Sequence, residues 1–309
     1  MGKHKIGVVG HGYWGKNQAR VFNELGVLEG VFDSKSNQNN NNNYKFYKSL
    51  EELIDSVDGI VICTPAETHY EIAKQALKKV DVLVEKPLAL KSSEVKSLMK
   101  IENKNNKLIM VGHQLHFHPA VLKMKELINS GEIGKIKWVY SNRLNMGKIR
   151  PYENVLWSFA PHDISLMLDF VNSKIIKTEV QGMKIINSKI EDTSLSLFEF
   201  QNKVKSHIFV SWIHPFKEQR FIIVGSKGSI VFSDTDEDKL KIYRTKILKS
   251  GDINKHSYRK VKISTKEPLK TQAEYFLKGI KNRKIKINNS NHALEVVSVL
   301  EECSTKMHK

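Results

Sequence analysis

The chain has 309 residues, enough for two domains of ordinary size, each with its own core. Its 40% apolar and 27% charged residues are typical of a globular protein, and the lack of any run of about eighteen apolar residues predicts no membrane span. The net charge of +17 invites a nucleic-acid partner, but Arg supplies only seven of the 50 basic residues and no compact basic stripe occurs, so we expect none.

The first 117 residues alternate short apolar runs with helical patterns, which is typical of βαβ units around a parallel sheet. The expected strands are nearly continuous in Val, Ile and Leu, as when helices cover both faces of a sheet. They are Lys5–Val9, Glu29–Phe32, Gly59–Cys63, Val80–Val84 and Leu108–Val111. The expected helices are Trp14–Leu25, Glu67–Lys78 and Ser92–Asn105, and the Asn-rich segment Asn37–Asn43 predicts a solvated loop.

The second half begins with an expected helix over Pro119–Ser130 and then changes to alternating apolar and polar residues. This alternation is typical of an antiparallel sheet with one wetter face. Its expected strands are Lys137–Asn145, Lys174–Ile186, Thr193–Phe200, Lys205–Ile213, Arg220–Val224, Ser229–Phe232 and Lys239–Tyr243. The expected helices are Ala160–Phe170, Thr271–Ile280 and His292–Cys303. The sequence thus predicts an α/β Rossmann domain over 1–117, followed over 118–309 by an α+β domain with a large, mostly antiparallel open sheet.

A glycine motif lies between the first expected strand and helix, in the stretch Gly10-His11-Gly12-Tyr13-Trp14-Gly15. In a G-x-G-x-x-G loop the first Gly allows a tight turn, the second lets the backbone approach a pyrophosphate, and the third lets the helix pack on the strand. Asp33 ends the second strand, where a carboxylate binds the ribose hydroxyls of NAD and repels the 2′-phosphate of NADP. The motif alone is also compatible with an ordinary strand–helix turn, and Lys35 leaves NADP as the alternative cofactor.

Four elements together resemble the glucose–fructose oxidoreductase / inositol dehydrogenase / MocA (Gfo/Idh/MocA) family of NAD(P)-dependent oxidoreductases. They are the glycine motif, Thr64-Pro65 with His69, the tripeptide Glu85-Lys86-Pro87 after the fourth strand, and His162 on the first helix of the second domain. The likeness continues through Pro268-Leu269 and the C-terminal helices, so it covers essentially the whole chain.

The resemblance implies that Lys86 and His162 are catalytic and that both lie near the nicotinamide C4, Lys86 from the first domain and His162 from the second. It also implies that the cofactor is bound by the glycine motif and Asp33 together with Thr64, Pro65, His69, Glu85, Lys86 and Gln114, and that the Lys86–Pro87 peptide is cis. Independently, open α/β sheets bind ligands at the carboxyl ends of their strands, where Thr64, Glu85 and Gln114 fall. By position alone, Lys86 is equally compatible with a surface lysine at a strand end, and His162 with a locally bonded helix residue.

Three segments resemble a subgroup of the family that modifies nucleotide sugars. They are Leu156–Ser165, Ser211–Gln219 and Ser141–Asn145. The resemblance implies oxidation of a sugar hydroxyl, most simply at C3 of a UDP-N-acetylhexosamine. The candidate contacts to the sugar or diphosphate are Arg143, Asn145, Trp157, Asp163 and Lys217. Two alternatives stay open, a dehydrogenase of a free polyol or hexose and a non-catalytic NAD-binding regulator. Retention of both Lys86 and His162 argues against the regulator.

The predicted chemistry is removal of a hydroxyl proton while hydride leaves the same carbon for the nicotinamide. A base with a pKa near 7 suits this step, which favours His162, with Lys86 stabilising the developing alkoxide. The reverse assignment stays open. Many family members carry Asp four residues before and three after this histidine, where this chain has Ser158 and Ser165, so an aspartate-assisted mechanism is not expected. No metal is expected.

The remaining expectations concern location and assembly. The only cysteines, Cys63 and Cys303, are too few for a disulfide framework and predict a reducing, cytoplasmic location. The runs Leu195–Phe200 and Ile208–Trp212 carry more apolar surface than one layer of helices can cover. We therefore expect a homodimer or homotetramer that forms through the open face of the C-terminal sheet.

Overall fold

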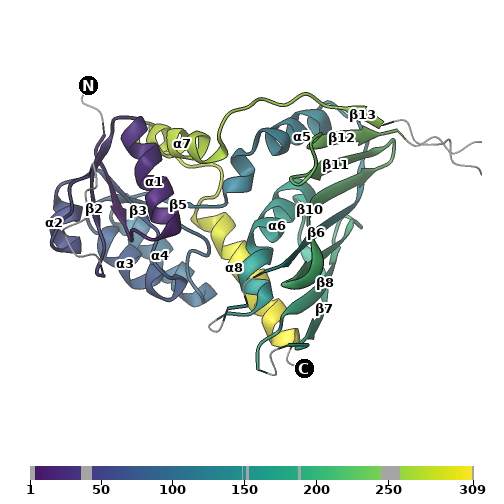
Figure 1. Ribbon diagram of the computed structural model, residues 1–309, viewed down its shortest axis with the longest axis horizontal. Helices are drawn as coiled ribbons and strands as arrows, with labels where there is room; N and C mark the ends of the chain where they lie inside the picture. The colour runs from purple at the N-terminus through teal and green to yellow at the C-terminus, as the bar shows by residue number, and fades with distance from the viewer. Residues whose placement is uncertain are drawn as a thin grey trace, which may run out of the picture. The chain divides into compact units, whose positions relative to one another are not determined.

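The computed structural model describes residues 4–35, 44–147, 149–150, 153–186, 189–244 and 258–307. These residues form two compact units, the first made of Met1–Gln114 with Glu267–Ser298 and the second of Leu115–Lys266 with Val299–Lys309 (Figure 1). The Asn-rich segment Asn37–Asn43 lies outside the described residues.

The first unit is built on a five-stranded parallel sheet in the order β2-β1-β3-β4-β5. Its strands are β1 (Ile6–Val9), β2 (Leu28–Phe32), β3 (Gly59–Ile62), β4 (Asp81–Val84) and β5 (Ile109–Val111). Its helices are α1 (Tyr13–Glu24), α2 (Leu50–Asp55), η1 (Ala66–Thr68), α3 (His69–Ala76), α4 (Ser92–Lys104) and α7 (Pro268–Asn282). The strand order changes direction at β1 and β3, and in such sheets ligands bind where the carboxyl ends of these two strands diverge.

A late segment of the chain, Glu267–Ser298, belongs to the first unit, whereas the sequence places it in a single domain over 118–309. Arg283, which follows α7, donates to both carboxylate oxygens of the buried Asp81 at the start of β4. Arg20 of α1 pairs with Glu267, and the Val111 amide donates to the Asn288 carbonyl. These long-range bonds account for the difference, because the local sequence pattern carries no information about which sheet α7 covers.

The second unit contains an eight-stranded sheet in the order β13-β12-β11-β10-β6-β9-β8-β7. All neighbouring pairs are antiparallel except β6 with β9, which are parallel. The strands are β6 (Ile136–Met146), β7 (Ile175–Met183), β8 (Thr193–Phe200), β9 (Lys205–Ser211), β10 (Ile213–Gly225), β11 (Ser229–Ser233), β12 (Leu240–Tyr243) and β13 (Tyr258–Lys260). Both sheets confirm the predicted fold class, an α/β Rossmann unit followed by an α+β unit with a large open sheet.

Helices cover one face of this sheet (Figure 1). They include α5 (Pro119–Asn129), α6 (Val155–Val171) and the end of α8 (Ser290–Met307), and the short helix η2 (Gln114–Phe117) precedes α5. The α6 side is the apolar interior, with Val139, Ile208 and Phe198 at most 2% exposed. Strand residues alternate between faces, so Trp138 and Tyr140 on β6 point to the opposite face.

Two helices differ from the sequence expectation. Helix α2 was not predicted, although Ser49 caps it by accepting from the Glu52 amide, the first half of an S-x-x-E capping box. Helix α6 begins at Val155, five residues before the predicted start at Ala160. Asn154 caps it there by accepting from the Trp157 amide, and Pro161 is accommodated inside the helix.

Candidate functional site

The glycine loop lies at the carboxyl end of β1 and leads into α1. Gly10 has a φ of +88°, which favours glycine, and a Cβ on Gly15 would lie 1.9 Å from the Gly10 carbonyl oxygen. A Cβ on Gly12, in contrast, would meet no heavy atom of the described residues within 4 Å beyond its chain neighbours. The first and third glycines are therefore required by the turn and by helix packing, and the second leaves open space beside the backbone.

The start of α1 suits an anion. Its N-cap residue is Gly12, no side chain caps the helix, and its first turn contains no acidic residue. The free N–H groups and the helix dipole at such an end favour a negative group. The residues present therefore fit the pyrophosphate of a dinucleotide. Tyr13 and Trp14, which flank this end, are 77% and 43% exposed.

Asp33 lies directly after β2 and reaches the glycine loop. One carboxylate oxygen accepts from the His11 amide at 2.6 Å, and the other accepts from the Lys35 amide at 2.8 Å. Asp33 thus brings a carboxylate to the carboxyl edge of the sheet next to the loop, as the sequence predicts for a residue that binds ribose.

The loops after β3 and β4 are joined by His69, the first residue of α3. The ring is 1% exposed, with Nδ1 2.7 Å from the Pro87 carbonyl oxygen and Nε2 2.8 Å from the Thr64 carbonyl oxygen. Burial lowers the pKa of this histidine. Both ring nitrogens of His69 thus lie against backbone carbonyl oxygens, and the predicted contact of His69 with the cofactor stays a prediction. The exposed Pro65 and the half-buried Thr64 lie on the loop that the ring braces.

The tripeptide Glu85-Lys86-Pro87 follows β4, and the Lys86–Pro87 peptide is cis, which confirms the expectation. Burial raises the pKa of the Glu85 carboxyl, whose Oε1 accepts from Gln18 Nε2 at 2.9 Å. Gln18 is fully buried on α1, and the sequence analysis did not identify it. The sequence signal that could have found Gln18 is its position as a polar residue on the apolar stripe of the helix, beside Ala19 and Phe22.

In the second unit, His162 lies on α6, half-buried, and the neighbouring Asp163 turns toward the sheet. Asp163 accepts from Arg143 Nε at 2.6 Å and Nη2 at 3.1 Å, and from Ser141 Oγ at 2.7 Å. Burial alone lowers the pKa of Arg143, but the Asp163 carboxylate more than offsets this and the pKa is raised. Two of the predicted substrate contacts thus bind each other.

The other predicted substrate residues occupy different settings. The Trp157 indole N–H donates to Ser304 Oγ on α8 at 2.8 Å, so this polar atom already has a partner in the second unit. Asn145 is half-buried near the end of β6, and Lys217 is exposed on β10. Gln114, predicted to bind the cofactor, is half-buried at the start of η2, and its amide donates to the Gly112 carbonyl.

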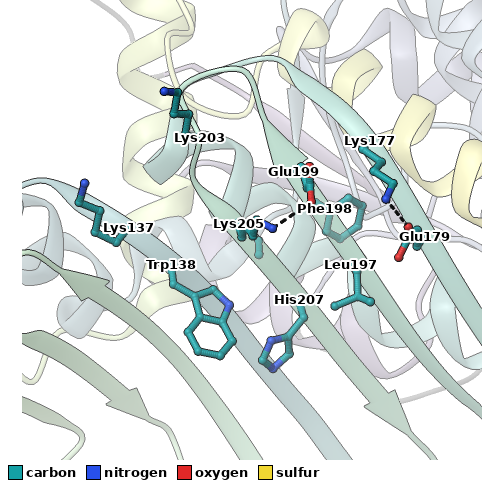
Figure 2. Close-up of a pocket in the computed structure, with 11 residues that line it drawn as sticks. Lys137, Trp138, Lys177, Glu179, Leu197, Phe198, Glu199, Lys203, Lys205 and His207 are labelled. Atoms are coloured by element: carbon teal, nitrogen blue, oxygen red, sulfur yellow. Dashed lines mark ion pairs between the residues drawn. The ribbon is translucent and has the colours of Figure 1, made fainter.

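A hollow of about 540 Å³ lies on the sheet of the second unit, and Figure 2 shows its lining residues. They include Trp138, Leu197 and His207, with Lys205 paired to Glu199 at the edge. No predicted site residue is among the described residues that line it. Within the described ranges, no helix is long and apolar enough to cross a membrane, and no three acidic, His or Cys side chains are arranged to hold a metal.

Comparison with protein families gives two matches that follow the two units. Residues 4–113 match a model described as "Oxidoreductase family, NAD-binding Rossmann fold", and residues 121–231 match "GFO/IDH/MocA C-terminal domain". The chain belongs to the Gfo/Idh/MocA family. The NAD-binding character of the first unit agrees with the glycine loop and Asp33.

Among curated Gfo/Idh/MocA relatives, the chain is 24% identical over 193 residues to UDP-N-acetylglucosamine 3-dehydrogenase of Acidithiobacillus ferrooxidans, an alignment that covers 60% of each protein. It is 25% identical over 245 residues to inositol 2-dehydrogenase/D-chiro-inositol 3-dehydrogenase of Lactiplantibacillus plantarum, covering 72% of this chain and 70% of the relative. The solved structure of the A. ferrooxidans enzyme shares the fold, with a TM-score of 0.88 and 19% sequence identity. The superposition covers 99% of this chain and 98% of that structure's chain.

Proposed function

We propose that this protein is an NAD-dependent dehydrogenase that oxidises a secondary hydroxyl of a nucleotide sugar, most simply C3 of a UDP-N-acetylhexosamine. The observation that carries the proposal is the position of Lys86. It follows β4 at the carboxyl edge of the sheet, the edge that also holds the glycine loop and Asp33. The similarity to UDP-N-acetylglucosamine 3-dehydrogenase supports the choice of substrate.

The proposed roles follow from the chemistry of each group. Bound NAD supplies the hydride acceptor. The free N–H groups at the start of α1 bind the pyrophosphate, and Asp33 accepts from the ribose hydroxyls. His162 takes the proton of the substrate hydroxyl, and Lys86 donates to the same oxygen and stabilises its developing negative charge. This proposal requires the substrate carbon to meet both side chains at once.

The buried ion pair between Arg143 and Asp163 changes the role that we propose for these two residues. Because Asp163 holds Arg143 through two hydrogen bonds, we assign these residues to shaping the substrate side of the second unit. Lys217 is exposed and suits the diphosphate as a mobile cation, while Asn145 suits a sugar hydroxyl. We also propose a cytoplasmic location, in keeping with the free thiols of Cys63 and Cys303.

The experiment is a substrate screen that follows nicotinamide fluorescence of the purified protein with NAD. Turnover of UDP-N-acetylhexosamines, absent with the free sugars, is the expected result. Turnover of inositol or another polyol without the UDP group would select the second candidate, which the similarity to inositol 2-dehydrogenase favours. Tight NAD binding with no turnover of any sugar would contradict an enzymatic role and indicate a regulator.

A further inference from the structure

His69 links the two loops that border the proposed reaction site. The Thr64 carbonyl belongs to the loop after β3, and the Pro87 carbonyl follows Lys86 in the loop after β4. The imidazole lies between these carbonyl oxygens, 2.8 and 2.7 Å away. The Thr64 loop also touches the glycine loop, because a Cβ on Gly10 would lie 3.0 Å from Thr64 Cγ2. The His69 side chain therefore connects the loop after β4, which carries Lys86, to the loop after β3, which in turn touches the glycine loop. Below, the glycine loop is called the cofactor loop.

The two partners of the ring are both acceptors. A neutral imidazole has one N–H and donates to one carbonyl, while its other nitrogen places a lone pair toward the second oxygen. A protonated ring donates to both. Burial lowers the pKa of His69, the two carbonyls and the nearby Glu67 oppose this, and Lys86 lowers it further. Burial, the largest of these effects, therefore favours the neutral ring, in which one N–H donates.

We infer that His69 is a positioning residue that sets the orientation of Lys86 relative to the cofactor loop. The inference rests on the proposed function, since it assigns His69 to the reaction of Lys86. The Thr64 side of the bridge has its own bracing, because Thr68 Oγ1 lies 2.7 Å from both Thr64 Oγ1 and the Pro65 carbonyl oxygen.

The loss of this bridge affects chemistry more than binding. The pyrophosphate and ribose of NAD are assigned to the glycine loop and Asp33, and the Asp33 carboxylate keeps its own bonds to the His11 and Lys35 amides. The reaction depends on where the Lys86 ammonium group stands, and a displacement of about 1 Å can cost about a hundredfold in rate. A positioning role thus predicts a lower kcat with an unchanged Michaelis constant for NAD.

The test compares His69→Leu, which removes both contacts, with His69→Gln, which keeps an N–H donor. The control is Tyr70→Phe at the next position of α3, which removes the hydrogen bond between the Tyr70 hydroxyl and Ser97 Oγ on α4. We expect His69→Leu to lower kcat about tenfold to a hundredfold, His69→Gln to recover part of this loss, and Tyr70→Phe to match the wild type. If His69→Leu does not fold, His69→Gln alone should show a reduced kcat with unchanged NAD affinity.

A second readout does not depend on turnover. Amide hydrogen exchange measured by mass spectrometry should show faster exchange over Lys86–Ala89 in His69→Leu, with the first turn of α1 unchanged. Normal exchange at Lys86–Ala89 would overturn the inference, as would normal kcat or a parallel fall in kcat, NAD affinity and melting temperature. Absence of turnover in the wild type would count against the proposed function, while the exchange result would still decide the role of His69.

Discussion

Lys86 and His162 are the two side chains on which the proposed proton transfer depends. Replacing His162 by Ala should lower turnover by about 10² to 10⁴, the usual contribution of a positioned acid–base group. Lys86→Ala should cost at least as much, since it removes a charge as well as a donor. Steady-state kinetics should show the double variant little worse than either single one, because the two groups act on one oxygen. Near-normal turnover of His162→Ala would contradict the mechanism.

The predicted preference for NAD over NADP rests on Asp33. Its carboxylate already accepts from the His11 and Lys35 amides, so it is held next to the loop where a ribose would bind. A 2′-phosphate would face this negative charge, so NAD should bind at least about tenfold more tightly than NADP, a difference of about 1.4 kcal/mol. Titration of both cofactors measures this, and Asp33→Asn should narrow the gap. Equal affinities of the wild type for NAD and NADP would contradict the assignment of Asp33 to the ribose.

The buried ion pair between Arg143 and Asp163 should contribute to the free energy of unfolding of the second unit. The two side chains are 15% and 2% exposed, so Asp163→Asn would leave a buried guanidinium without its counter-charge. Such a loss typically costs about 3–5 kcal/mol in the free energy of unfolding. Denaturant unfolding followed by tryptophan fluorescence should reveal it. Glu126→Gln, which removes the exposed pair with Lys123 on α5, should be nearly neutral, and equal effects of the two changes would be contrary to this account.

At the scale of the elements, two glycines in the turn between β1 and α1 have different roles. We expect that Gly15 is needed for the fold, whereas Gly12 is needed only for NAD binding. A methyl group on Gly15 would collide with the Gly10 carbonyl oxygen at 1.9 Å, so Gly15→Ala should lower the melting temperature and abolish NAD binding. Gly12→Ala meets no heavy atom of the described residues within 4 Å beyond its chain neighbours and should keep the melting temperature. Its methyl group would occupy the space for the pyrophosphate, so calorimetry should show weaker NAD binding. A destabilised Gly12→Ala would contradict this division.

The sequence predicts elements well where local signals decide. The buried parallel strands have continuous apolar runs, and β1, β3, β4 and β5 lie within the predicted ranges. The start of α6 was misplaced by five residues because the cap formed by Asn154, itself a local signal, was not recognised. The sequence fails where a distant partner decides. The pairing of Arg143 with Asp163, and of Gln18 with Glu85, depends on how β6 meets α6 and how α1 meets β4, which no local pattern encodes.

At the scale of the whole molecule, the uncovered face of the eight-stranded sheet predicts assembly. Trp138 and Leu197 are both 44% exposed there (Figure 2). The Tyr140 ring stacks on His207 with centroids 4.9 Å apart. An apolar face of this kind is typical of an interface, and two-fold pairing is its commonest form.

Light scattering should therefore give at least twice the chain mass of 35.5 kDa. Leu197→Lys should shift the protein toward the monomer by placing a charge on this exposed face. Leu90→Lys, a change of an exposed leucine in the first unit, should leave the mass unchanged. A wild-type mass of one chain at micromolar concentration would refute the predicted assembly.

The return of Glu267–Ser298 to the first unit has a consequence for biosynthesis. A ribosome releases the chain from its N-terminus, and domains generally fold as they emerge. The parallel sheet is complete in sequence after β5, but Arg283, the partner of buried Asp81, is translated only after the whole eight-stranded sheet. Until then the Asp81 carboxylate accepts from the Leu108 amide but lacks its counter-charge. We therefore expect a chaperone that holds the emerging chain to matter most in this interval.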